Sequence, residues 1–401
     1  MKKNQYITSL SMILLLAIMP MACVEPFDFQ TESFEQALVV EARITNELIQ
    51  QEIKLSQTHR LEEDGPNVEP NATIFVKDDM GSEFDFDEIE PGTYKSIDSF
   101  AVQTGRSYQL NIRLINGRSY VSTFEETPPI AQIDRVYGDR VTNASGFDGL
   151  SIFVDASNVE GEAQYFRYQY EETYKLVAPE WKPIDVIVYA IPGKDQCILV
   201  TELRPQDQIT CYVSPSRKNA NVLNLSSNNA NMVQRHPVRF ISDENYKMAS
   251  RYSILVRQLV QTRDANAYFE ALDNFTGSGN LFSQLQAGYI QGNITSESNS
   301  DEPVIGFFEV ATLDTNRYFF NYSDFYQGSL PPPYFVPCDP FPIPDAINQP
   351  CAVRYSDIIE NNIVYFDAMG GGGGSSYRYV QRLCGDCTEV GTPEIPEFWE
   401  E

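Results

Sequence analysis

The sequence predicts a mainly β protein, with an N-terminal immunoglobulin-like β-sandwich followed by a second β-rich domain that contains one or two helices. Two observations carry this prediction. Short segments in which apolar and polar residues alternate recur along the chain, as half-buried strands do. The chain also contains 23 Tyr and 24 Phe, which are enriched in strands, and its apolar content of 42% is too high for a disordered chain.

The first residues have the features of a secretory signal peptide. Lys2 and Lys3 precede a mostly apolar run, Ile7–Met19. This run is shorter than the roughly 20 apolar residues that span a bilayer. An ordinary signal peptide or a short uncleaved anchor would look similar.

The end of this run resembles the lipobox of bacterial lipoproteins, in which a cysteine is acylated and the chain is cut before it. Ala22 precedes Cys23 directly, although Pro20 replaces the usual aliphatic residue. We therefore expect residues 1–22 to be removed and residues 23–36 to form a tether that carries its acyl chains, such as palmitate, on Cys23. Several acyl chains together anchor a protein stably to a membrane.

The residue after the lipidated cysteine indicates which membrane the protein reaches. An aspartate at this position would resemble a signal for retention in the inner membrane, but the residue here is Val24. By analogy, we expect the protein at the outer membrane of the cell, with its folded part exposed at the surface.

The chain is strongly acidic. Its net charge is −27, and removal of residues 1–22, which carry two lysines and no acids, changes it to −29. Such a surface repels nucleic acid and anionic lipid head groups, so neither is an expected partner. The acidity either confers solubility alone or helps the protein dock on a basic surface.

Six cysteines remain once the lipidated one is set aside, and an even number in an oxidising compartment predicts disulfides. Proximity in the sequence favours the three pairs Cys197–Cys211, Cys338–Cys351 and Cys384–Cys387. A zinc site is the alternative, but the sequence lacks a second Cys-x-x-Cys pair. No cofactor and no metal are expected.

Residues 37–126 carry the strand pattern of the predicted sandwich. Leu38–Ile44, Ile53–Thr58 and Ala72–Val76 are expected strands. Two further strands flank Asn116-Gly117, a dipeptide that strongly predicts a tight hairpin. Thr127-Pro128-Pro129 then breaks the pattern and predicts a domain boundary.

Residues 130–401 are expected to form the second domain. Its strands include Tyr165–Tyr170 and Val304–Ala311, and an Asn-rich loop is expected from Asn219 to Asn231. One helix is predicted at about 262–276. Thr262 can cap its start, and its apolar residues recur at three- and four-residue steps. They are Tyr268, Phe269, Leu272 and Phe275.

The C-terminal residues suggest a clasp that fixes the end of the chain. Cys384-x-x-Cys387 lies near the chain end without the βαβ context of a thioredoxin-like redox site. We expect a structural disulfide there, with Phe398 and Trp399 packed against a sheet. The preceding segment, 330–376, is rich in Pro and Gly and is expected to form loops.

No motif points to catalysis. His59 and His236 are the only histidines, and neither lies in a recognisable motif. The chain contains no Gly-x-Ser-x-Gly elbow and no His-Glu-x-x-His. A pair of carboxylates among the 56 acids would be the remaining route to a hydrolase, and only their geometry in space can test it.

Several short segments, taken in order, resemble the domain-of-unknown-function 4249 family of Bacteroidota lipoproteins. They are Val39–Ala42, Ser278–Phe282 with Gly292–Ile294, Val304–Phe308, Cys384–Gly391 and Pro396–Trp399. The Pro- and Gly-rich segment 330–376 departs from that pattern. Members of this family are often encoded beside TonB-dependent outer-membrane receptors, so the resemblance implies an accessory role in transport.

The expected function is therefore that of a non-catalytic outer-membrane lipoprotein, which captures a ligand or assembles a complex at a TonB-dependent receptor. The sequence does not identify the ligand. A free-standing surface binding or adhesive protein is the alternative, and a secreted hydrolase has weaker support.

Overall fold

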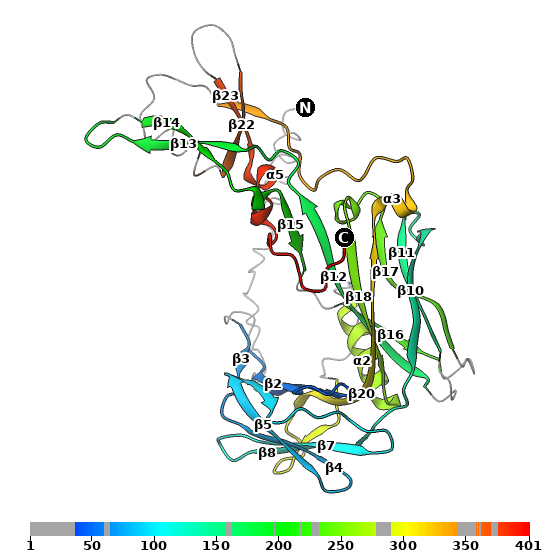
Figure 1. Cartoon of the computed structure of the whole chain (residues 1–401). Helices are drawn as coiled ribbons and strands as arrows, with labels where there is room; N and C mark the ends of the chain where they lie inside the picture. The colour runs from blue at the N-terminus through cyan, green and yellow to red at the C-terminus, as the bar shows by residue number, and fades with distance from the viewer. Residues whose placement is uncertain are drawn as a thin grey trace, which may run out of the picture. The chain divides into compact units, whose positions relative to one another are not determined.

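The computed structural model describes most of the chain from Ala37 onward (Figure 1). The predicted fold class is confirmed, because the elements are mainly strands and α2, Arg263–Gly277, is the longest helix in the described part. The described residues are 37–59, 65–157, 163–195, 197–215, 219–225, 232–277, 290–343, 358, 360, 362–369 and 376–401.

The N-terminal strands alternate between buried and more exposed residues, as the sequence predicts. In β7, for example, Tyr108, Leu110 and Ile112 are buried. The turn at Asn116-Gly117 joins β7 to β8, and Gly117 has a φ of 87° that favours glycine. The strands are β1 Leu38–Thr45, β2 Glu52–Gln57, β3 Asn67–Val68, β4 Thr73–Asp78, β5 Glu83–Glu90, β6 Thr93–Ser96, β7 Ser107–Arg113, β8 Ser119–Ser122 and β9 Glu125–Glu126.

Two strands from much later in the chain complete this N-terminal sheet. The order is β20-β1-β2-β6-β5-β4-β7-β8-β19, where β19 is Ile294–Ser296 and β20 is Val304–Phe320. A bridge between Gln291 and Ile305 brings the segment before β19 back to β20. The sheet thus folds around one core, as the strands of a sandwich do.

The sandwich is consequently not confined to residues 37–126. The first part of β20 runs parallel to β1, from Leu38 opposite Val304 to Thr45 opposite Ala311. Val304, Phe308 and Val310 belong to the same core as the N-terminal strands. Alternation of apolar and polar residues predicts that a strand has a buried face. It does not predict which distant strand will pair with it.

A second core lies between two sheets. One contains β10 Gln132–Thr142, β11 Asp148–Ser157 and β17 Met232–Ser242. The other contains β15, β12, β18 and the second part of β20. The even-numbered residues of β12, β18 and β20, such as Tyr168 and Ile254, face this core. The remaining bounds are β12 Tyr165–Val177, β15 Thr210–Val213, β16 Asn219–Asn224 and β18 Tyr252–Val260.

Part of the predicted Asn-rich loop is a strand instead. Asn219–Asn224 forms β16, which pairs with β12 from Tyr170 to Tyr165. Asparagine is depleted in strands, so the local composition predicts a loop. Backbone pairing with a long neighbouring strand overrides that preference.

The predicted helix is confirmed as α2, with bounds within one residue of those expected. Thr262 Oγ1 accepts a hydrogen bond from Ala265 N at 3.2 Å, as an N-cap does. Tyr268 is buried against Phe307 of β20, with ring centroids 5.3 Å apart. Leu272, farther along the expected apolar face, is 37% exposed.

A buried ion network lies near the point where β20 passes from the first core to the second. Glu309 is 1% exposed, and its carboxylate binds both Arg43 of β1 and Arg167 of β12. Gln261 also donates to this carboxylate, at 2.5 Å. Burial would raise the pKa of Glu309, but the two guanidinium groups lower it to about 2. The network therefore connects strands of both cores through one ionised side chain.

Candidate functional site

The hairpin β13 Ile184–Ala190 and β14 Cys197–Leu203 packs on a small sheet, with the order β21 Phe341–Ile343, β23 Ser376–Gln381 and β22 Ile363–Met369. We call these five strands the hairpin module. The module has its own core, where Val186 and Val188 of the hairpin meet Tyr365 and Tyr379 of the sheet. Most of its sheet lies in segment 330–376, for which the sequence predicts loops, and that prediction is wrong for β21 and β22.

The hairpin carries apolar side chains on both faces. Val186 and Val188 point to the module core, whereas the opposite face carries Ile187 beside Val200 and Tyr189 beside Ile198. Tyr189 is 45% exposed and Ile198 is 51% exposed. An exposed apolar cluster of this kind is typical of an interaction surface. We call these four outward-facing residues the hairpin patch.

The disulfide Cys338–Cys384 lies within the module. Cys384 is in the short helix α5, Arg382–Gly385, directly after β23, and it is fully buried beside Val364 and Val380. Cys338 lies before β21. The bond therefore ties both flanks of the small sheet together across 46 residues of sequence.

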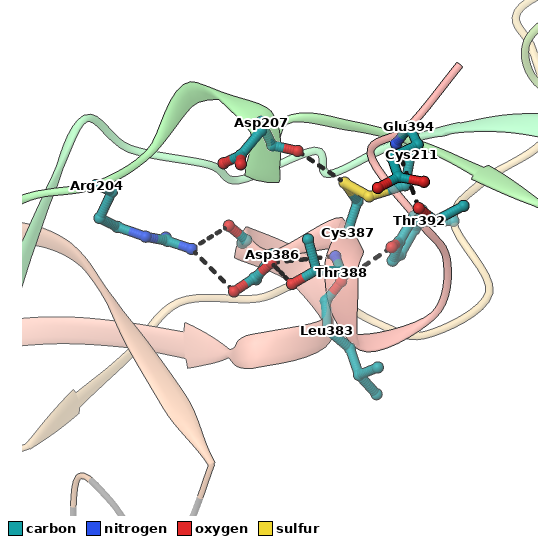
Figure 2. The surroundings of a disulfide bond; sticks show 11 residues. Arg204, Asp207, Cys211, Leu383, Asp386, Cys387, Thr388, Thr392 and Glu394 are labelled. Atoms are coloured by element: carbon teal, nitrogen blue, oxygen red, sulfur yellow. Dashed lines mark hydrogen bonds and ion pairs between the residues drawn. A yellow bond between two sulfur atoms is a disulfide. The ribbon is translucent and has the colours of Figure 1, made fainter. Parts of the chain in front are cut away.

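A second disulfide, Cys211–Cys387, joins the end of the module to β15 (Figure 2). Both cysteines are fully buried. Closing a loop of 176 residues removes much conformational freedom from the unfolded chain. This bond therefore restrains the hairpin module relative to the sheet of the second core.

A buried ion pair lies beside this disulfide (Figure 2). Arg204 donates from NH2 to Gly385 O at 2.8 Å and lies 3.6 Å from Asp386 Oδ2. Asp386 in turn accepts from Thr388 N at 3.1 Å and from Thr388 Oγ1 at 2.6 Å. Burial lowers the pKa of Arg204, and the charges of Asp185 and Asp386 oppose that change. These contacts hold the chain rigid between the two disulfides.

The cysteine pairing predicted from sequence proximity is wrong. Cys197–Cys211, Cys338–Cys351 and Cys384–Cys387 are all excluded, because Cys211 binds Cys387 and Cys338 binds Cys384. Cys197 is also disulfide-bonded, and Cys351 lies outside the described residues. Short loops close most easily in an unfolded chain. In the folded chain, however, Cys384 and Cys387 lie in different short helices and face different segments.

This pairing also bears on the redox and zinc alternatives. Cys384 and Cys387 do not bond each other, so they form no thioredoxin-like couple. The described part of the chain has no group of three or more His, Cys, Asp or Glu side chains arranged to hold a metal ion.

The C-terminal residues lie against the sheet of the second core. Thr392 forms a bridge with Tyr212 of β15. The Trp399 ring lies 4.9 Å from that of Tyr212 and 5.6 Å from that of Phe319. Phe398 is 39% exposed and lies under the guanidinium of Arg317, at 3.5 Å.

The histidines have no catalytic surroundings in the described structure. His236 in β17 lies beside Tyr168, with ring centroids 4.9 Å apart, and burial lowers its pKa to about 4. Its imidazole is therefore neutral near pH 7. His59 follows β2 at the edge of a gap in the described residues.

The predicted lipid attachment site, Cys23, lies outside the described residues together with the signal peptide and the tether. Among the helices that the structure describes, none is long and apolar enough to cross a membrane.

A family model described as "Domain of unknown function (DUF4249)" matches residues 24–317. The chain belongs to the DUF4249 family. No curated protein matches the chain. The DUF4249 match includes the N-terminal core, most of the second core and the β13–β14 hairpin. It ends within β20, before β21, β22, β23 and the C-terminal motif at 384–399.

The structure explains the small and polar residues in two of the segments that resemble DUF4249, Gly292–Ile294 and Val304–Phe308. A Cβ at Gly292 would lie 1.7 Å from Gly306 O, and a Cβ at Gly306 would lie 2.0 Å from Val40 O. Asn293 also bonds both backbone groups of Phe308, at 2.8 and 3.0 Å. These residues allow three chain segments to approach closely, so they specify the closure of the sandwich.

The sequence reasoning missed the hairpin patch as a candidate site. One signal could have revealed it, because Val186-Ile187-Val188-Tyr189 is a continuous apolar run. Such a run is typical of a strand that is covered on both faces. In the part of the chain that the structure describes, Tyr189 and Ile198 on the second face remain about half exposed.

Proposed function

We propose that this protein is a lipoprotein anchored through Cys23 to the outer membrane, where it acts as a non-catalytic accessory to a TonB-dependent receptor. The hairpin patch would be its contact with the receptor. The observation that carries this proposal is an apolar surface on a hairpin that two disulfides and a buried ion pair support.

The disulfides support export. Disulfides persist in oxidising compartments and are rare in the cytosol. Cys211–Cys387 and Cys338–Cys384 are fully or largely buried and link distant segments, as structural disulfides do. Together with the signal-like residues 1–22, they favour a protein that folds outside the cytoplasm.

The hairpin patch supports binding. Tyr189 and Ile198 are large side chains, each about half exposed, and they lie directly opposite each other in the hairpin. Tyrosine is enriched in interfaces because it buries much area with few rotatable bonds. A scaffold that is already rigid loses little entropy when it binds.

The test is a pull-down of the tagged, lipidated protein from outer membranes solubilised in mild detergent, followed by mass spectrometry. A TonB-dependent receptor recovered in stoichiometric amount is the expected result. The double variant Tyr189→Ser/Ile198→Ser should lose the receptor. The double variant Ile115→Ser/Phe147→Ser changes two other exposed apolar residues, 75% and 63% exposed, and should retain it.

Other outcomes would count against the proposal. Recovery of the lipoprotein alone would favour the second candidate, a free-standing surface binding protein. A receptor that remains bound to the hairpin variant would place the contact elsewhere. Labelled palmitate should be incorporated into the wild type and not into Cys23→Ala, and labelling of that variant would exclude Cys23 as the lipid attachment site.

A further inference from the structure

The sheet of the second core has a second face, which carries arginines. The odd-numbered residues of β12, β18 and β20 point away from the core. The strand register places Gln169 beside Arg257, and Arg257 beside Thr315. The next row contains Glu171, Leu255 and Arg317. We call this surface the arginine face.

One of its arginines lacks a carboxylate partner. Arg317 donates from NH1 to Ser253 Oγ at 3.0 Å, but no carboxylate of the described chain lies within ion-pair distance of it. Its neighbour Arg257 is 33% exposed and lies 3.3 Å from Glu171, which is 52% exposed. The Nε atom of Arg257 makes no hydrogen bond despite that proximity.

Positive charge also exceeds negative charge where β1 pairs with β20. Arg43 and Arg167 share the single carboxylate of Glu309, and Arg43 NH1 reaches Gln169 at 3.1 Å. On or beside this face, four guanidinium groups therefore share two carboxylates, those of Glu171 and Glu309. The four belong to Arg43, Arg167, Arg257 and Arg317. The chain as a whole has a net charge of −27, so this excess of positive charge is local.

The chain's own acidic C-terminus occupies the neighbouring part of the same face. Phe398 lies under Arg317, and Trp399 lies on Phe319. Glu401 pairs with Lys175 at 3.0 Å, and Arg251 donates to Glu400 O. An acidic segment with aromatic residues is thus already bound here by arginine, lysine and ring contacts.

We propose that the part of the arginine face left open beside the C-terminal residues docks an acidic segment of a partner protein, with Arg257 and Arg317 binding its carboxylates. Guanidinium groups match carboxylates in geometry and hold them by two parallel hydrogen bonds. Arg317 has no carboxylate of the described chain within ion-pair distance, and Arg257 can exchange Glu171 for the incoming group. The surface is distinct from the hairpin patch, so it does not depend on the proposed receptor contact.

The test measures binding of labelled hexaglutamate to the full mature protein by fluorescence anisotropy, with hexaglutamine as the control peptide. Hexaglutamate should bind and hexaglutamine should not. Arg257→Gln and Arg317→Gln should each weaken binding about tenfold, because each removes one charge-assisted contact. Physiological salt should weaken the interaction, since the residues are partly exposed.

Two further variants keep the test decisive. Glu171→Gln removes the competing carboxylate from an exposed position, and it should strengthen hexaglutamate binding several-fold. Arg135→Gln/Arg235→Gln changes the net charge as much as Arg257→Gln and Arg317→Gln do together. Its side chains are 65% and 50% exposed on β10 and β17, and it should leave binding unchanged.

Three results would overturn the proposal. The wild-type protein fails to bind hexaglutamate, or the Arg135/Arg235 variant loses as much affinity as the Arg257 and Arg317 variants. The third result is displacement of hexaglutamate by millimolar citrate while longer glutamate peptides bind no better, which would indicate a site for a small anion.

Discussion

At the scale of single residues, Glu309 holds a buried ion network together. Its carboxylate is buried between Arg43 and Arg167, and replacing it leaves two guanidinium groups without their partner. Glu309→Gln should therefore destabilise the protein by about 3–5 kcal/mol in denaturant unfolding. Asp139→Asn breaks an exposed pair with Arg235 and should cost at most about 1 kcal/mol. Equal effects of the two variants would contradict this account.

The same residue predicts a pH dependence. The pKa of Glu309 is lowered from 4.5 in the unfolded chain to about 2 in the folded protein. Its ionised form therefore stabilises the fold fully at pH values above the pKa of the unfolded chain. That contribution is lost as the pH falls from 4.5 through about 2. The stability difference between wild type and Glu309→Gln should shrink over this range, and a constant difference would exclude the linkage.

Gly306 tests the closure of the sandwich. It has a φ of 126°, and a Cβ there would lie 2.0 Å from Val40 O of the paired strand. Gly306→Ala should cost about 3 kcal/mol or more, since strain and overlap act together. Gly117→Ala is the matched control, because its φ is also positive but nothing lies within 4 Å. It should cost about 1–2 kcal/mol. A similar loss of stability in Gly306→Ala and Gly117→Ala would show that the close approach of Gly306 to Val40 O is unimportant.

At the scale of elements, strand and helix positions could be predicted where local patterns are strong. The alternation in β4 and β7 and the Thr262 cap of α2 are examples. β16 and β22 were missed, because asparagine content and neighbouring glycines indicate loops. Pairing with β12 and with β23 makes them strands, and such pairing is not encoded in the local composition.

The C-terminal segment makes an element-scale prediction. Trp399 has two ring contacts with the sheet, to Tyr212 and Phe319. Trp399→Ala should lower stability by about 1–3 kcal/mol and reduce the melting temperature measured by circular dichroism. Ile395→Ala alters a residue of the same segment that is 66% exposed and should have little effect. An unchanged melting curve for Trp399→Ala would mean that the segment does not fix the chain end.

At the scale of the whole molecule, the two cores depend on one strand. β20 spans 17 residues, and its first part pairs with β1 while its second part pairs with β18. Ile294, Val304, Phe308 and Val310 all belong to the N-terminal core. Burial of four such side chains contributes roughly 6–12 kcal/mol, which is comparable to the stability of a whole domain.

A fragment of residues 37–126 should therefore fail to fold by itself. Its amide NMR spectrum should lack dispersion, whereas that of residues 37–401 should be well dispersed. A dispersed spectrum from the short fragment would show that the sandwich folds without β19 and β20.

Local patterns in the sequence are enough to predict a β-rich chain, a capped helix at α2, the hairpin at Asn116-Gly117 and membership of a family. Which distant segments meet becomes visible in the folded chain alone. There β1 pairs with β20, Cys211 bonds Cys387, Tyr189 and Ile198 of the β13–β14 hairpin stay about half exposed, and arginines lie beside the acidic C-terminus. The physical reason is that periodicity and caps act within a few residues, whereas pairing and burial depend on contacts between residues far apart in the chain.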